Sequence, residues 1–148
     1  MSRLFFLLFL TSLTVPSSLC LAAEVVVHPC VDEPWLTRSF ARLLFTMRVL
    51  RWRGGGKVQV FVLPDRHPLH QKFAKELLNL YPRQLRRVWE RNRFSGAGAV
   101  PIEVTSVDEM LARVASTPGA IGYLPDGRGR DKVRVIPAIC DRNKICLP

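Results

Sequence analysis

The sequence predicts an α/β fold, in which helices flank a small mixed sheet that is partly parallel. Three observations support this prediction. Short runs of aliphatic and β-branched residues alternate with longer segments whose apolar residues recur every three or four positions. Glycine and proline residues separate the two kinds of segment. The chain has 148 residues, which is the length of one domain with a small core and appendages.

The N-terminal segment is expected to be a secretory signal peptide, and therefore not part of that core. Arg3 gives it a positive start, and the apolar run over residues 4–13 is too short to span a membrane comfortably. We expect cleavage after Ala22, with Ala23 as the alternative, and hence a periplasmic or secreted protein. A lipid anchor on Cys20 is a further alternative, but a leucine precedes it where lipoproteins normally carry a small residue.

This assignment divides the chain into three parts. Residues 1–22 are the signal peptide, residues 23–126 form the α/β domain, and residues 127–148 form a C-terminal strand with a disulfide hairpin. The formal net charge of the whole chain is +10. Such an excess of positive charge favours acidic partners.

Four strands are expected in the domain and its C-terminal extension. Each is a short aliphatic or β-branched run bounded by proline, glycine or polar turn residues. In chain order they cover residues 24–28, 57–63, 120–124 and 133–139.

Four helices are expected between these strands, each with apolar residues at helical spacing. Thr37 and Ser106 are typical N-caps for the first and the fourth helix, and Pro82 suits the first turn of the third. The expected inward residues are Phe40, Leu43, Leu44 and Met47 in the first helix, Leu69, Phe73, Leu77 and Leu80 in the second, Leu85, Val88 and Trp89 in the third, and Met110, Leu111 and Val114 in the fourth.

The glycines are interpreted as turn and packing residues. The run over residues 54–56 lacks the Lys-Ser/Thr that follows the glycines of a nucleotide-binding loop, so a turn is expected there. Pro118 and Gly119 should end the fourth helix, with Gly119 in the left-handed conformation. Gly122 should allow a neighbouring helix or backbone to approach the last strand of the domain closely.

Three cysteines follow the predicted cleavage site. Cys140 and Cys146 flank a polar stretch with a three-residue loop over residues 142–144, which would set the two sulfurs opposite each other in a hairpin. We expect a Cys140–Cys146 disulfide, because an exported chain meets oxidising conditions. The alternative is that Cys30 pairs with one of the two and closes a much longer loop.

A series of short motifs follows one another in order through residues 24–124. Together they resemble the PstS-like substrate-binding proteins of ABC transporters, which are type 2 periplasmic binding proteins, in a shortened single-lobe form. The residues that carry the resemblance are the run LTRSFARLLF over residues 36–45, Trp52 before a glycine turn, Val62-Leu63-Pro64, His67-Pro68-Leu69 with Phe73, Trp89, Phe94-Ser95-Gly96, Pro101, Glu103-Val104, Ser106 and the run TPGAIGY over residues 117–123.

The resemblance implies a fold like one lobe of such a protein, and a function without enzymatic activity or cofactor. The implied ligand is phosphate or another small anion, and the implied partner is an ABC transporter or another envelope protein. In the resembled family the loop after the second strand usually offers arginine, serine, glycine and threonine to the anion. Here that loop carries Pro64, which has no amide donor, and Asp65, which repels an anion unless it accepts a proton from it.

Four residues remain as candidate anion ligands. Arg66 and His67 in this loop can present positive charge or hydrogen bonds to an anion. Ser95 and Ser106 complete the set, although helix capping also explains Ser106. Neither serine has the nucleophile-elbow pattern of a hydrolase.

The same loop contains residue types that bind metals. Asp65, His67 and His70 could supply carboxylate and imidazole ligands. Pro68 separates the two histidines, and no fourth ligand is evident in the sequence. An ordinary loop followed by a helix is the preferred interpretation, so no metal is expected.

The third predicted helix is strongly basic. Arg83, Arg87 and Arg91 follow one another at intervals of four, and Glu90 is the single acidic residue nearby. The plain interpretation is a solvated face over an apolar core. The functional interpretation is attraction to an acidic surface, such as anionic lipid, a polyanion or an acidic protein. The signal peptide argues against nucleic acid.

Two functions therefore stay open. The first is an exported substrate-binding-protein-like domain that binds phosphate or another small anion as an accessory of ABC-type uptake. The second is a ligand-free lobe that acts as an envelope protein-interaction module. Residues 65–69 discriminate between them, because the first function requires an anion site there.

Overall fold

The computed structural model describes residues 23–96, 98–140 and 144–145. The strands are β1 (Ala23–Val27), β2 (Leu36–Thr37), β3 (Gln59–Val62), β4 (Ile102–Glu103), β5 (Ala120–Pro125), β6 (Arg134–Ile136), β7 (Ala138–Cys140) and β8 (Lys144–Ile145). The helices are α1 (Arg38–Phe45), α2 (Pro68–Glu76), α3 (Pro82–Phe94) and α4 (Val107–Ser116). The predicted signal peptide lies outside the described residues.

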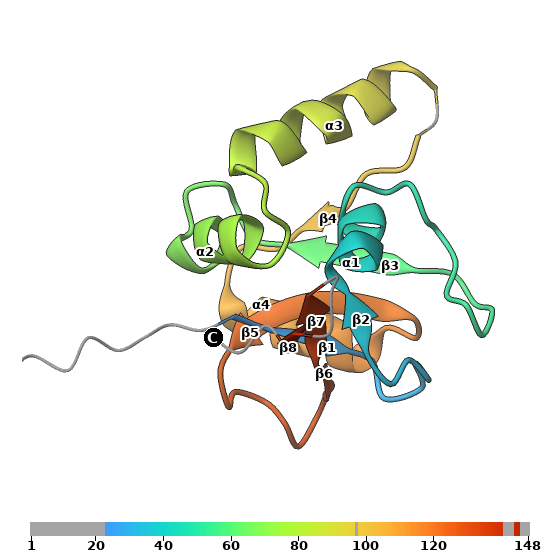
Figure 1. Cartoon of the computed structure of the whole chain (residues 1–148), viewed down its shortest axis with the longest axis vertical. Coiled ribbons are helices and arrows are strands. Elements are labelled where there is room, and N and C mark those ends of the chain that lie inside the picture. Colours follow the sequence, from blue (N-terminus) through green and yellow to red (C-terminus); the bar gives the residue numbers. More distant parts are fainter. Residues whose placement is uncertain (1–22, 97, 141–143, 146–148) are drawn as a thin grey trace, which may run out of the picture.

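The main sheet is mixed, as the sequence predicts. Its strand order is β4-β3-β5-β1-β6 (Figure 1). β3 runs parallel to β4 and to β5, whereas β1 pairs antiparallel with β5 and with β6. A second, three-stranded sheet has the order β2-β7-β8. The α/β fold class is therefore confirmed.

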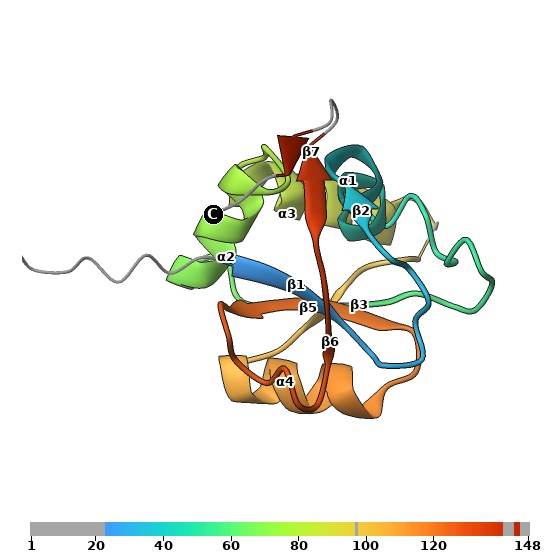
Figure 2. The ribbon, with the colours of Figure 1, turned by 60° about the horizontal axis from the view of Figure 1, so that its bottom comes forward.

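Helices cover both faces of the main sheet. Figure 2 shows α4 on one side of β1 and β5, and α1, α2 and α3 on the other. This arrangement explains why the central strands are apolar throughout, since residues 25–27 and 120–124 are all buried. Among the described residues, no helix has both the length and the apolar character needed to cross a membrane.

The core has a different character on the two faces. On one face, α4 lies so close to β5 that a Cβ on Gly122 would stand 2.6 Å from Met110 Sδ and 3.0 Å from Val114 Cγ2. The close approach expected at this glycine is confirmed. On the other face, Phe73 stacks on Tyr123 with ring centroids 4.0 Å apart, and Phe45 meets Phe73 edge-on at 4.7 Å.

The predicted caps and helix ends are present. Thr37 Oγ1 accepts a hydrogen bond from the Phe40 amide, and Pro82 occupies the first turn of α3. Gly119 follows α4 with a φ of +76°, as expected for a left-handed exit.

Some predictions from the sequence are wrong in detail. Leu43 is 38 % exposed, because α1 turns Ala41, Leu44 and Phe45 towards the core instead. The strand predicted over residues 133–139 is divided at Pro137 into β6 and β7, which belong to different sheets. The two-residue strands β2 and β4 were not predicted, since neither contains an apolar run of recognisable length.

The C-terminal hairpin also differs from the predicted one. β7 and β8 are antiparallel, but Cys140 pairs with Lys144, which is not the predicted register, in which Cys140 lies opposite Cys146. Cys146, and with it the predicted Cys140–Cys146 disulfide, lies outside the described residues. Cys30 is exposed and forms no disulfide with a described residue.

Candidate functional site

The parallel strands β3, β4 and β5 end at the same edge of the main sheet. We call this the carboxyl edge, and it comprises residues 63–67 after β3, residues 104–106 after β4, and the end of β5. Helices α2 and α4 begin directly after the first two of these segments. Ligands of open α/β sheets bind at this kind of edge, where side chains and helix N-termini converge.

Three charged residues form an ion-pair network at the carboxyl edge. Arg86 of α3 donates two hydrogen bonds to Asp65, from Nε to Oδ2 at 3.1 Å and from Nη2 to Oδ1 at 2.9 Å. The same Nη2 donates to Glu103 Oε2 at 2.7 Å. The hydrogen bond to Asp65 is the main cause that raises the pKa of Arg86 above its ordinary value.

The network carries a net charge of −1, because one guanidinium faces two carboxylates. The side chains of Arg86 and Asp65 are each about one-third exposed and that of Glu103 is nearly half exposed, so water reaches the network. A hollow of about 130 Å³ borders Arg86 and Glu103, with Trp89 of α3 as part of its wall.

A buried polar chain lies behind Asp65. Tyr123 Oη accepts a hydrogen bond from the Leu63 amide at 2.8 Å and stands 2.5 Å from His70 Nδ1. Burial raises the pKa of Tyr123 and lowers the pKa of His70 to about 4. Both side chains are therefore neutral at pH 7.

The proton positions in this chain follow from the donors that are available. Tyr123 Oη already accepts one hydrogen bond, so its hydroxyl is best placed to donate to His70 Nδ1. The imidazole proton of His70 is then on Nε2. His70 is 0 % exposed, and Nε2 has no hydrogen-bond partner among the described residues. It lies 3.8 Å from Asp65 Oδ1, so a buried N–H faces the same carboxylate that Arg86 holds.

The structure brings three of the four predicted ligand residues to the carboxyl edge. Arg66 is exposed there and forms no ion pair with a described residue. His67 caps α2, with Nδ1 accepting from the Leu69 amide at 3.2 Å. Ser106 caps α4, with Oγ accepting from the Glu109 amide at 3.1 Å. Both caps use their acceptor atoms within the fold.

Ser95 lies apart from the other three. It follows the last residue of α3, about two and a half turns beyond Arg86. Its hydroxyl donates to the Asn92 carbonyl at 3.3 Å, and it is exposed.

Four residues of this site were not predicted from the sequence. Arg86 lies in the predicted basic helix but had no role assigned, and His70 was considered only as a possible metal ligand. Glu103 and Tyr123 lie within the motifs that carry the family resemblance but had no role assigned. The signal that could have found them is the meeting of parallel strand ends at one edge. This signal can be used only if β4 is recognised as a strand, and the sequence does not predict β4.

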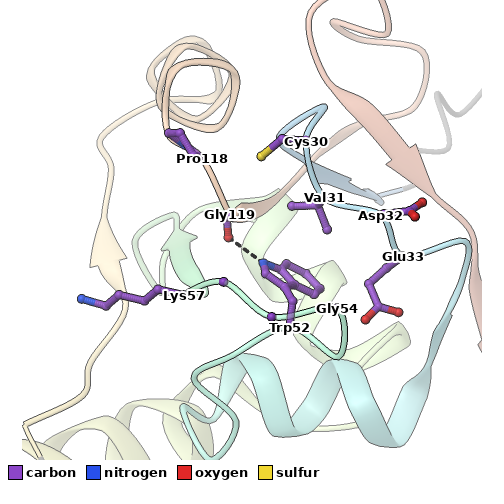
Figure 3. A pocket seen from close by; sticks show the side chains of 11 residues that line it. Cys30, Val31, Asp32, Glu33, Trp52, Gly54, Lys57, Pro118 and Gly119 are labelled. Carbon is purple, nitrogen blue, oxygen red and sulfur yellow. Dashed lines mark hydrogen bonds between the residues drawn. The ribbon is translucent and has the colours of Figure 1, made fainter.

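A larger pocket, of about 280 Å³, lies at the other edge of the sheet, where β3 and β5 begin (Figure 3). The Trp52 indole forms its floor and donates from Nε1 to the Gly119 carbonyl at 3.0 Å. Glu33 is 4 % exposed and accepts from the Arg53 amide at 3.2 Å. Figure 3 shows the Lys57 side chain extending away from the indole. None of the predicted ligand residues lines this pocket.

The cysteine at the rim of that pocket has one polar neighbour. Cys30 Sγ lies 2.8 Å from His28 Nδ1, which also accepts a hydrogen bond from the Cys30 amide. Within the described part of the chain, no three histidine, cysteine, aspartate or glutamate side chains come together as metal ligands.

No known family model and no curated protein matches the chain. Solved structures do match its fold. An ABC-type phosphate transport receptor from Vibrio cholerae superposes with a TM-score of 0.61 at 14% identity, over 78% of this chain and 45% of that one. A putative phosphate ABC transporter substrate-binding protein with bound phosphate from Clostridium perfringens gives a TM-score of 0.64 at 15% identity, over 78% and 44%.

PstS from Borrelia burgdorferi also matches, with a TM-score of 0.61 at 13% identity, over 86% of this chain and 49% of that one. This chain thus spans about half the length of the structures it matches. The resemblance to one lobe of the phosphate-binding proteins is confirmed at the level of the fold. At such low identity, ligand and partners do not carry over from these structures to this chain.

Proposed function

We propose that this chain is an exported solute-binding lobe that binds a small protonated oxyanion, such as hydrogenphosphate, at its carboxyl edge. The fold supports this role, since the matched structures are phosphate receptors and substrate-binding proteins. The observation that carries the proposal is that Arg86 orients the acceptor Asp65, and that the next residue, Arg66, is exposed and forms no ion pair with a described residue. An ABC-type transporter is the corresponding partner.

Charge explains why the anion should carry a hydrogen. Asp65, Glu103 and Arg86 together have a net charge of −1, and Arg66 adds a positive charge beside them. A fully ionised anion would be repelled by Asp65 and gain little. An anion with an O–H group can donate to Asp65 while its other oxygens accept from Arg66. The edge should therefore prefer hydrogenphosphate to sulfate.

The lobe alone encloses such an anion from one side only. The free side stays in water, where charge-assisted hydrogen bonds are weaker than in a closed site. Tight binding therefore requires a second surface against the carboxyl edge, which in the proposal is either another lobe or the transporter. Binding to this chain alone should be weak.

A thermal-shift titration tests this proposal. Phosphate at pH 7 should raise the melting temperature of the protein more than sulfate at equal ionic strength does, because only hydrogenphosphate donates to Asp65. Arg66→Ala should abolish the phosphate shift. Arg51→Ala is the matched control, since Arg51 is also exposed and lies in the segment before the glycine turn. An equal response to both anions, or a shift that survives Arg66→Ala, contradicts the proposal.

A ligand-free interaction module is the second candidate function. The polar groups at the carboxyl edge favour this function because most already have partners within the fold. Arg86 is paired with two carboxylates, and His67 and Ser106 cap helices. This function predicts no shift with any small anion, and it predicts that crosslinking recovers an envelope partner.

A further inference from the structure

The outward side of α3 carries a row of positive charge. Arg83, Arg87 and Arg91 are exposed there, and none of their side chains forms an ion pair or hydrogen bond with a described residue. Phe94 shares this side and is 85 % exposed. We call these four residues the α3 face.

Helix geometry places the four side chains together. At 100° per residue, Arg83, Arg91 and Phe94 all lie within about 40° of the direction of Arg87. The buried side, formed by Leu85 and Trp89, points almost the opposite way.

The buried side of α3 holds the helix in place. Trp89 Nε1 donates to the Phe45 carbonyl at 2.8 Å, and Asn92 Nδ2 donates to the Thr46 carbonyl at 3.2 Å. Figure 1 shows α3 at one end of the molecule, beyond α1 and α2. The α3 face is thus a convex, fixed surface that protrudes from the domain.

Several arginines elsewhere in the domain are neutralised. Arg86, Arg128, Arg130 and Arg134 each pair with a carboxylate. On α3, the single acid is Glu90, which lies at the border of the face. Among the described residues, the arginine side chains at these three consecutive helical turns have no partner. Their positive charge is therefore available to an external anion.

We propose that the α3 face binds the surface of a lipid bilayer that contains anionic headgroups. Guanidinium groups at successive turns of one helix can each bind a headgroup phosphate of a lipid surface. Such binding does not require a partner of complementary shape. An exposed aromatic ring beside basic residues is typical of peripheral helices that lie at the headgroup level.

A bilayer fits this face better than an acidic protein does. A protein partner of stable affinity usually buries aromatic anchors in pockets, whereas this face is convex and its ring stands free. The inference is independent of the proposed anion site, because Arg86 points to the carboxyl edge from another side of α3 and none of the four face residues belongs to that site.

Vesicle co-sedimentation of the full chain tests the inference. The protein is mixed with vesicles of phosphatidylcholine alone or with a large share of phosphatidylglycerol, at low and at raised salt. Binding to phosphatidylcholine measures any contribution that does not depend on charge, including that of residues 1–22. We expect an increment with phosphatidylglycerol that salt removes.

Two charge-matched triple variants locate the binding surface. Arg83→Glu, Arg87→Glu and Arg91→Glu together should reduce the phosphatidylglycerol increment more than tenfold, since one arginine near the surface contributes about fivefold. Arg48→Glu, Arg51→Glu and Lys132→Glu change the net charge equally at exposed positions elsewhere and should reduce it much less. Phe94→Ser should weaken binding with no change in salt dependence.

Other outcomes overturn the inference. An equal loss in both triple variants means that net charge alone attracts the protein. Wild-type binding that does not depend on phosphatidylglycerol, or capture of an acidic protein without any vesicle binding, excludes the lipid surface as the ligand. All six substitutions are at exposed side chains, and circular dichroism checks that each variant is folded. Arg66→Ala should leave vesicle binding unchanged, so this test and that of the anion site can fail separately.

Discussion

His70 is the residue in which burial and charge conflict most directly. Its ring is enclosed between Tyr123 and Asp65, and its pKa falls to about 4 because burial disfavours the imidazolium. The nearby carboxylate of Asp65 opposes this shift but does not reverse it. A neutral His70 therefore contacts Tyr123 in the core through Nδ1, while Nε2 faces Asp65 at the carboxyl edge without a hydrogen bond to it.

This burial predicts a pH dependence of stability. The unfolded chain binds a proton at His70 below about pH 6.5 and the native protein only near pH 4, so stability is lost as the pH falls through that window. The loss from this group amounts to about 3 kcal/mol at the bottom of the window. Urea unfolding at pH 7 and pH 4.5 measures it.

His70→Gln provides the control for this prediction. Glutamine keeps a polar side chain near Tyr123 but does not titrate, so the free energy of unfolding should fall less between the two pH values than in the wild type. Carboxylates contribute equally to both proteins and cancel in the comparison. The same pH dependence in both would show that burial does not lower the pKa of His70 in the native protein.

The contact between α4 and β5 depends on one glycine. Any side chain at residue 122 would push against Met110 and Val114, both of which are fully buried. Met110 is flexible enough to yield partly, but Val114 is branched and set on the same helix face. The absence of a side chain at residue 122 therefore sets how closely α4 packs on β5.

Glycine substitutions test this packing. Gly122→Ala should lower the free energy of unfolding by about 1 to 3 kcal/mol. Gly119→Ala should cost more, because its Cβ would overlap the Lys57 carbonyl and its φ is +76°. Gly54→Ala meets no atom within 4 Å and should stay within about 0.5 kcal/mol of the wild type. Chemical denaturation measures all three, and equal losses at residues 54 and 122 would contradict the packing account.

At the scale of the whole molecule, local patterns predicted the elements better than their assembly. Thr37, Pro82 and Ser106 mark helix starts through capping chemistry that depends on a few neighbouring residues, and these predictions hold. β4 was missed because Ile102 and Glu103 are both exposed and carry no strand pattern. Its identity is decided by pairing with β3, which is a contact between distant parts of the chain.

In the candidate site, too, local features were predicted from the sequence, whereas contacts between distant residues were not. Arg66 and His67 were found because they occupy a loop that follows a recognisable strand. The bonds from Arg86 to Asp65 and Glu103 join residues 21 and 17 positions apart, across three separate elements. No local sequence pattern predicts such contacts. The ion-pair network and its net charge can therefore be recognised only in the folded structure.

The central claim is that a small protonated oxyanion binds at the carboxyl edge. The most direct measurement is a phosphate titration followed by amide chemical shifts in nuclear magnetic resonance, with wild type and Asp65→Asn compared at pH 7. The account predicts that the shifts concentrate at residues 65–70 and 104–107 and largely disappear in Asp65→Asn. Shifts centred on the pocket around Trp52, or no shifts at all, would contradict it.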